Sequence, residues 1–186
     1  MRKMKTILFT GNPNYGLAEA FSKIETADFI SRSNNYDLCT KDGIERAKVL
    51  SLDYDIFINN SALYNFHQTK LFDSIWNYWR SFGKSGYIIN IGSTTDRTTK
   101  GSGWVYQIEK KSLREISNQR GLLGVWGRSG IRVSYISFGS LNTPKVIEKH
   151  PDRKLLEIQK AAAIIKYLID TPSDIVVNEI SVDPIQ

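Results

Sequence analysis

Short apolar runs alternate with segments of helical periodicity along almost the whole chain, and this alternation limits the folds open to it. The runs expected to be strands are 5–10, 27–31, 36–38, 55–59, 87–91, 131–136 and 175–182. The segments expected to be helices are 16–24, 42–52, 65–82, 103–119 and 154–169. Runs such as 87–91 are apolar throughout, which is typical of strands covered on both faces. The pattern predicts an α/β fold: one Rossmann-like, doubly wound parallel sheet of about seven strands with helices on both faces.

One domain accounts for the length. The 186 residues suffice for one core and fall short of two ordinary domains, and no linker or internal repeat interrupts the pattern. We therefore expect 1–186 to form a single domain. The lone cysteine, Cys39, excludes an intrachain disulfide and a cysteine-rich zinc site. Two histidines leave few other ligands for a transition metal, so no metal is expected.

No segment has the composition of a membrane-directed sequence. The apolar run at 7–9 is too short for the core of a signal peptide. No stretch approaches the roughly 18 uninterrupted apolar residues of a membrane-spanning helix. We expect no membrane partner and a cytoplasmic location.

The formal net charge of +6 allows an anionic partner. The basic residues are scattered, and the densest group, 149–154, is interrupted by Pro151 and Asp152. This spacing does not favour a nucleic-acid surface. A small ligand that carries phosphate fits the charge better.

The turn between the first predicted strand and the first predicted helix contains Gly11 and Gly16. Glycines at such a turn let the backbone approach a pyrophosphate, and the helix start offers free N–H groups. The alternative is a plain strand-to-helix turn, since two glycines form a weak motif and Ala18 stands where a third is usual. The contacts to a dinucleotide predicted here are Gly11, Asn14, Tyr15, Gly16 and Leu17.

The end of the second predicted strand bears on the choice of cofactor. An acidic residue that grips the adenosine ribose is usual there, but the chain has Ser31 and Arg32. A guanidinium suits a 2′-phosphate and cannot accept bonds from ribose hydroxyls. The position therefore predicts NADP rather than NAD, the alternative being a solvated surface arginine.

Tyr106 and Lys110 lie four residues apart on one predicted helix and share a face. A nearby ammonium stabilises a phenolate, which makes Tyr106 a candidate general acid and base. In a chain with nine tyrosines such pairs also arise by chance. Ser93, at the end of the fifth predicted strand, adds a hydroxyl that would project toward the same cleft.

Further motifs follow in a definite order along the chain. They are Thr10-Gly11 with Gly16, Asp37-Leu38, Asn59-Asn60-Ser61-Ala62, Asn90-Ile91-Gly92-Ser93, Tyr106 with Lys110, and Gly139 with Thr143-Pro144. In this order and spacing they resemble the short-chain dehydrogenases/reductases over nearly the whole chain. The resemblance implies a single NAD(P)-binding Rossmann-type domain.

The resemblance also implies roles for four side chains. Tyr106 would exchange a proton with the substrate oxygen, and Ser93 would orient that oxygen. Lys110 would bind ribose hydroxyls of the cofactor and lower the pKa of Tyr106. Asn65 would anchor a water that relays protons to Lys110. The alternative for Ser93 and Asn65 is a turn residue and a helix cap.

The remaining cofactor contacts are implied by position in the family pattern. Besides Tyr106, Lys110 and the residues of the glycine turn, they are Ser31, Arg32, Asp37, Leu38, Asn60, Ser61, Ala62, Gly139 and Thr143. Ser61 and Ala62 depart from the alanine and glycine of the family, and Phe138 replaces a proline. The chain is also shorter than most members, with the helix between the second and third predicted strands missing.

The predicted helix 65–82 carries apolar residues on more than one stripe. Exposed aromatic surface usually marks an interface, so the pattern predicts a homodimer or homotetramer through this helix and the helix that holds Tyr106. The alternative is a helix buried within one chain.

The leading functional hypothesis is an NADP-dependent oxidoreductase that interconverts a carbonyl and a secondary alcohol on a small substrate. A catalytically weak nucleotide-binding sensor or scaffold on the same fold is the alternative. A basic nucleic-acid binder is a third and weaker one.

Overall fold

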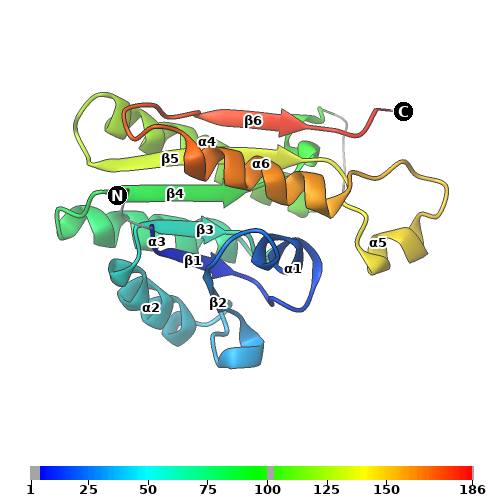
Figure 1. Cartoon of the computed structure of the whole chain (residues 1–186), viewed down its shortest axis with the longest axis horizontal. Coiled ribbons are helices and arrows are strands. Elements are labelled where there is room, and N and C mark those ends of the chain that lie inside the picture. The colour runs from blue at the N-terminus through cyan, green and yellow to red at the C-terminus, as the bar shows by residue number, and fades with distance from the viewer. Residues whose placement is uncertain (1–4, 100–102, 186) are drawn as a thin grey trace.

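A six-stranded parallel sheet forms the centre of the molecule. The computed structural model describes residues 5–99 and 103–185. Within these ranges the strands are β1 (Ile7–Thr10), β2 (Asp28–Ile30), β3 (Ile56–Asn59), β4 (Gly86–Ile91), β5 (Ile131–Phe138) and β6 (Glu179–Val182). Their order across the sheet is β2-β1-β3-β4-β5-β6, and each neighbouring pair is parallel (Figure 1). The predicted doubly wound α/β fold is confirmed.

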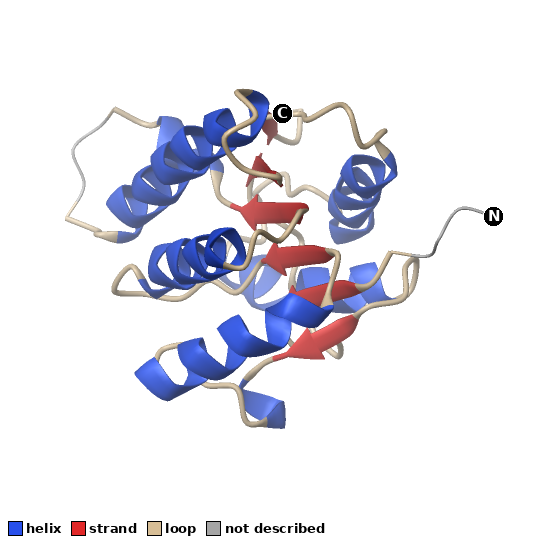
Figure 2. Ribbon diagram, turned by 90° about the vertical axis from the view of Figure 1, so that its left-hand side faces the viewer, coloured by secondary structure: helices blue, strands red, loops and turns tan. Residues whose placement is uncertain are grey.

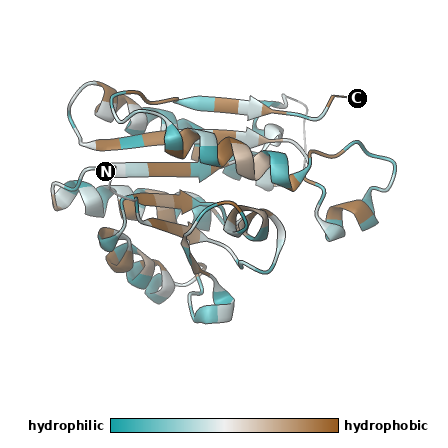
Figure 3. Ribbon diagram, viewed as in Figure 1, coloured by the Kyte–Doolittle hydropathy of each residue, from teal (hydrophilic) through white to brown (hydrophobic). Residues whose placement is uncertain are grey.

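Helices cover both faces of this sheet (Figure 2). They are α1 (Gly16–Ser22), α2 (Lys41–Leu50), α3 (His67–Ser81), α4 (Tyr106–Val125), α5 (Pro144–Lys149) and α6 (Ile158–Asp170). Residues of α1 and α6 pack in one core cluster, and residues of α2, α3 and α4 pack in the other. The hydropathy colouring accordingly places brown residues on the inner strands (Figure 3).

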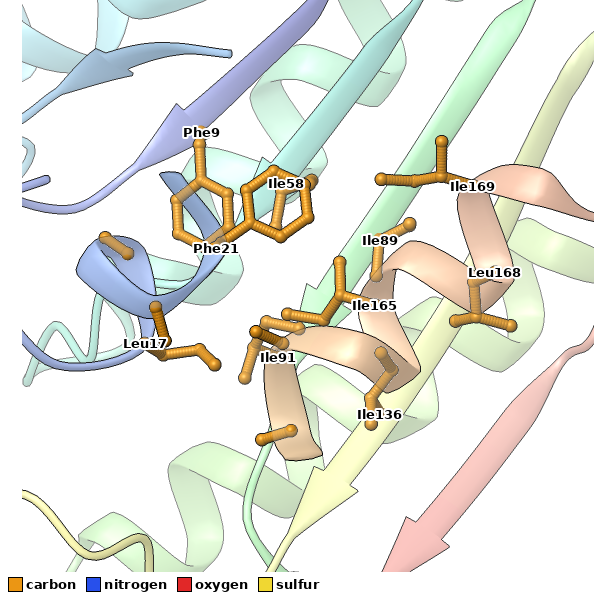
Figure 4. Packing of buried hydrophobic residues seen from close by; sticks show 14 of the residues in the cluster. Phe9, Leu17, Phe21, Ile58, Ile89, Ile91, Ile136, Ile165, Leu168 and Ile169 are labelled. Atoms are coloured by element: carbon orange, nitrogen blue, oxygen red, sulfur yellow. The ribbon is translucent and has the colours of Figure 1, made fainter. Parts of the chain in front are cut away.

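Alternate side chains of each strand enter the two core clusters. Phe9 and Ile58 face α1 and α6, whereas Leu8 and Phe57 face the other helical layer. Phe9 lies against Phe21 of α1, with ring centroids 5.1 Å apart (Figure 4). Burial on both faces explains why these strands are apolar without a break.

The third predicted strand, 36–38, is absent from the described sheet. The carbonyl of Asp37 accepts hydrogen bonds from the backbone N–H and the hydroxyl of Thr40, which turns the chain directly into α2. Leu38 is buried beneath that turn. Six strands therefore stand where about seven were expected, and β2 is an edge of the described sheet.

The start of α3 differs from the prediction in a way that affects the site. Asn65 and Phe66 have positive φ angles of 57° and 60°, so the helix begins at His67 rather than at residue 65. The last helix begins at Ile158 instead of 154, and α4 continues to Val125. The short helix α5 was not predicted.

The apolar residues of α3 are mostly internal. Leu71, Phe72, Ile75, Trp76 and Trp79 are fully buried within one chain. The alternative of a helix buried within the chain therefore holds for these residues, and the homodimer or homotetramer stays a prediction. Among residues 5–99 and 103–185, no helix combines the length and apolar character that crossing a membrane requires.

Candidate active site

The loops that follow β1, β3, β4 and β5 meet at one edge because all four strands run in the same direction. In Figure 1 the arrowheads of β3, β4 and β5 point toward the side where α5 lies. These loops contain many of the predicted site residues: the glycine turn follows β1, Asn60 follows β3, Ser93 follows β4 and Thr143 follows β5. The edge is where open parallel sheets bind ligands.

The glycine turn is shaped by two residues with positive φ. Gly11 has φ 152° and Gly16 has φ 61°, conformations that other residues rarely adopt. A Cβ on Gly11 would lie 3.0 Å from Ala18 Cβ and from Asn60 Nδ2, and one on Gly16 would lie 3.7 Å from Thr143 Cγ2. Gly11 therefore permits close packing of the turn against Ala18 and Asn60, and Gly16 lies at ordinary contact distance from Thr143. A tight glycine turn between a strand and a helix is typical of dinucleotide-binding loops.

Hydrogen bonds fix the glycine turn and join it to the loop that follows β3. The Asn12 side chain accepts from the Asn14 N–H at 2.9 Å. The Thr10 hydroxyl accepts from the N–H groups of Asn60 and Ser61, at 2.8 and 3.0 Å. The ends of β1 and β3 are therefore held together. Of the predicted cofactor contacts here, Tyr15 and Ala62 are exposed, whereas the Leu17 side chain is buried in the core.

At the end of β2 the chain makes a turn of 3-10 helix, η1 (Arg32–Asn34), which leaves Arg32 exposed. Burial and the Asp37 carboxylate raise the pKa of the Cys39 thiol, and the Arg32 guanidinium lowers it. Arg32 and Asp37 thus act on the same thiol from nearby positions. Ser31 begins the turn, and the Leu38 side chain lies in the core.

Ser93, Tyr106 and Lys110, hereafter the Ser–Tyr–Lys cluster, are brought together. Ser93 follows β4 and begins another turn of 3-10 helix, η3 (Thr94–Arg97), while Tyr106 is the first residue of α4. The side chains of Ser93 and Tyr106 are hydrogen-bonded. The Lys110 ammonium lies 5.2 Å from the centroid of the Tyr106 ring. The helical spacing seen in the sequence therefore places a base beside the phenol.

The ionisation of the cluster reflects its burial. Burial raises the pKa of Tyr106, and the hydrogen bond with Ser93 acts in the opposite direction. The carboxylates of Glu109 and Asp96 raise it further. Burial lowers the pKa of Lys110 to about 8, although the same two carboxylates favour its ammonium form. Both groups are thus displaced toward their neutral forms.

Solved structures of similar shape cover nearly all of the chain. A short-chain dehydrogenase/reductase family protein matches with a TM-score of 0.74 at 20% identity, over 96% of this chain and 95% of that one. A 4-hydroxyisoleucine dehydrogenase complexed with NADH matches with a TM-score of 0.73 at 19% identity, over 97% of both chains. A short-chain dehydrogenase from Burkholderia cenocepacia J2315 in complex with NADP matches with a TM-score of 0.75 at 14% identity, over 95% of this chain and 87% of that one. This chain has the short-chain dehydrogenase/reductase fold.

Sequence comparison finds relatives over part of the chain. An uncharacterized oxidoreductase of Staphylococcus aureus strain MW2 is 33% identical over 102 residues, which are 54% of this chain and 43% of the relative. A counterpart in Staphylococcus epidermidis is 31% identical over 54% of this chain and 44% of its own length. The matches thus span less than half of the relatives' length. No protein-family model matches the sequence.

On this short-chain dehydrogenase/reductase fold, Asn65 lies two residues before the start of α3, and its role as anchor of a water relay stays a prediction. Its side chain is exposed, and its carbonyl accepts a hydrogen bond from Lys70 at 3.2 Å. The amide that contacts Lys110 belongs to Gln68, whose Oε1 lies 2.5 Å from Lys110 Nζ. The sequence signal for Gln68 was weak: a polar residue one turn before the buried Leu71 and Phe72.

A buried carboxylate beneath Ser93 was also missed. Asp96 accepts hydrogen bonds from the Tyr135 hydroxyl at 2.7 Å and from the Ser137 hydroxyl at 3.2 Å. The Tyr135 phenol lies against Gly92, where a Cβ would stand only 1.8 Å from its oxygen. Gly92, Tyr135 and Asp96 therefore support the loop that carries Ser93. Gly139 similarly leaves room for Asp183, whose Oδ1 would lie 2.8 Å from a Cβ there.

Proposed function

We propose that this chain is an NADP(H)-dependent oxidoreductase that interconverts a carbonyl and a secondary alcohol on a small substrate. The observation that carries the proposal is the Ser–Tyr–Lys cluster, which lies at the same carboxyl edge of the parallel sheet as the glycine turn. Ser93 comes from the loop after β4, and Tyr106 and Lys110 come from α4. A purely structural fold has no need of a phenol, a hydroxyl and a buried amine at this edge.

Each member of the cluster has a chemical task in this proposal. Tyr106 gives a proton to the substrate oxygen during reduction and takes it back during oxidation. Ser93 donates a hydrogen bond to the same oxygen and so stabilises the charge that develops on it. Lys110 holds ribose hydroxyls of the cofactor and, in its ammonium form, favours the phenolate of Tyr106. The nicotinamide ring supplies or accepts the hydride.

The residues present fit a nicotinamide dinucleotide. Gly11 and Gly16 both have positive φ and form a tight turn that packs beside Asn60 and Thr143. Solved proteins with this fold bind NADP in one case and NADH in another. For this chain the exposed Arg32 after β2 favours NADP, because its guanidinium would pair with the 2′-phosphate.

Two exposed aromatic rings lie against the Tyr106 ring. Trp104 is 56% exposed and stacks on Tyr106 with ring centroids 4.7 Å apart, and Tyr64 is 61% exposed with its centroid 6.5 Å from the same ring. Exposed rings beside a reacting group favour an apolar or aromatic substrate. We propose a carbonyl that carries such a group.

A weak nucleotide-binding sensor remains the second candidate. The burial that raises the pKa of Tyr106 and the absence of an edge strand beyond β2 in the described sheet both favour it. Such a protein would bind the dinucleotide without consuming it.

Titration with NADPH and NADH tests both candidates. We expect the wild type to bind NADPH more tightly than NADH, and Arg32→Asp to lose about tenfold or more of its NADPH affinity with little change for NADH. Equal affinity of the wild type for both would remove the NADP assignment. NADPH oxidation over a panel of aromatic and aliphatic carbonyls then separates enzyme from sensor, because binding without turnover in either direction supports the sensor.

A further inference from the structure

Gln68 holds the amine of Lys110 by a direct hydrogen bond. The side chain is only 4% exposed, as is that of Lys110, and its Oε1 lies 2.5 Å from Lys110 Nζ. The carbonyl of Ile91 is the other acceptor near Nζ, at 3.4 Å. An ammonium has three donors, so one remains for a ligand on the side of Tyr106.

The orientation of the Gln68 amide is determined by its surroundings. Its Nε2 donates to the carbonyls of Asn59 and Ile91, both at 2.9 Å. A primary amide has two N–H donors, and both are used here. The oxygen must therefore face Lys110, because a reversed amide would put N–H groups against an ammonium and its oxygen against the carbonyl oxygens of Asn59 and Ile91.

The charged groups around Lys110 make their hydrogen bonds to other residues, although Glu109 Oε2 is buried without a hydrogen-bond partner. On its own helix, Glu109 accepts from the Phe66 N–H at 3.2 Å. On η3, Asp96 accepts from Tyr135 and Ser137. Tyr106 on α4 and Tyr135 on β5 are the remaining titratable neighbours. In the described part of the chain no carboxylate lies within ion-pair distance of Lys110, so its nearest partner is a neutral amide.

We propose that Gln68 is a positioning residue: its amide oxygen fixes the amine of Lys110 beside Tyr106 and sets the pH range over which that amine carries a proton. The catalytic meaning of this contact rests on the proposed oxidoreductase function, whereas the contact itself does not.

The first test uses the unmodified protein and NMR of glutamine side-chain amides across pH 6.5–10. The Gln68 carboxamide signals should titrate with the same midpoint as Lys110, and the titration should vanish in Lys110→Met. A Gln68 amide that does not respond to pH, or that responds equally in Lys110→Met, would overturn the proposal.

The second test measures the Lys110 midpoint directly by NMR of a sample labelled with ¹⁵N-lysine. Gln68→Met keeps the length of the side chain but removes the acceptor, so the Lys110 midpoint should fall by about one pH unit. Gln107→Met is the control, since Gln107 is a buried glutamine of α4 that bonds to the Thr98 carbonyl. Equal midpoints in the two variants would contradict the assigned role.

Activity separates this inference from the proposed function. If NADPH turnover is found, the part of its pH profile that depends on the titration of Lys110 should move in Gln68→Met by the same amount as the Lys110 midpoint. The profile should not move in Gln107→Met. If no turnover is found, the function fails while both NMR tests still decide the role of Gln68.

Discussion

Replacement of Gly92 by alanine should destabilise the protein through a single identifiable contact. The added methyl would lie 1.8 Å from the Tyr135 oxygen and 2.1 Å from its Cζ, so the phenol must move. Movement breaks its 2.7 Å bond to the buried Asp96 carboxylate. Losing a hydrogen bond to a charged group costs about 1.5–3 kcal/mol, and forcing a methyl into a packed core costs about 1–3 kcal/mol. We expect the free energy of unfolding to fall by about 3–5 kcal/mol.

Thermal unfolding followed by circular dichroism measures this effect. For a domain of this size the loss corresponds to a fall in Tm of about 6–20 °C. Gly103→Ala is the matched control, because a Cβ there meets nothing within 4 Å. In a double-mutant cycle, Tyr135→Leu should recover part of the loss caused by Gly92→Ala, with a coupling energy of about 1–3 kcal/mol. A Gly92→Ala variant as stable as Gly103→Ala would refute the reasoning.

Three further predictions concern the cluster and its surroundings. Tyr106→Phe should abolish turnover and leave NADPH affinity nearly unchanged, because only the proton donor is lost; measurable turnover in this variant would exclude Tyr106 as the acid. Burial lowers the pKa of Lys110 in the folded state to about 8 from an ordinary 10.5. Between these two pH values the unfolded chain binds more protons than the folded chain. The free energy of unfolding should therefore rise from pH 8 to pH 10, by up to about 3 kcal/mol. Urea unfolding should show that Lys110→Met flattens this dependence, and an unchanged slope would contradict it. Trp104→Ala should raise the KM for aromatic carbonyls about tenfold with a smaller effect on aliphatic ones; equal effects on both would argue against a stacking role.

The strands and the Ser–Tyr–Lys cluster could be predicted because their signals lie in short stretches of sequence or in the order of motifs along the chain. A run such as 87–91 is apolar throughout, and the helical spacing of Tyr106 and Lys110 places them on one face whatever the tertiary structure. Residues 36–38 were misread as a strand, since three residues with one buried leucine satisfy a turn equally well.

The supporting residues could not be predicted from local patterns. The Gln68 amide is oriented by groups of β3, β4 and α4, and these meet it only in the folded chain. Asp96 is likewise buried by hydroxyls of β5, some forty residues along the chain. The resemblance indicated Asn65 as the anchor of a water relay to Lys110, and it gave no signal for the direct contact that Gln68 makes.

The edge position of β2 divides the proposed site into two parts of unequal rigidity. In the described sheet this three-residue strand pairs with β1 alone, whereas β4, which ends just before Ser93, has a neighbour on each side. Segments with few partners open locally at a lower free-energy cost than the interior of a sheet. The adenosine half of a dinucleotide would thus bind beside β2, a segment that opens locally in solution, and its binding would carry the entropic cost of ordering that segment. The half where proton transfer is proposed would be preorganised before any ligand arrives.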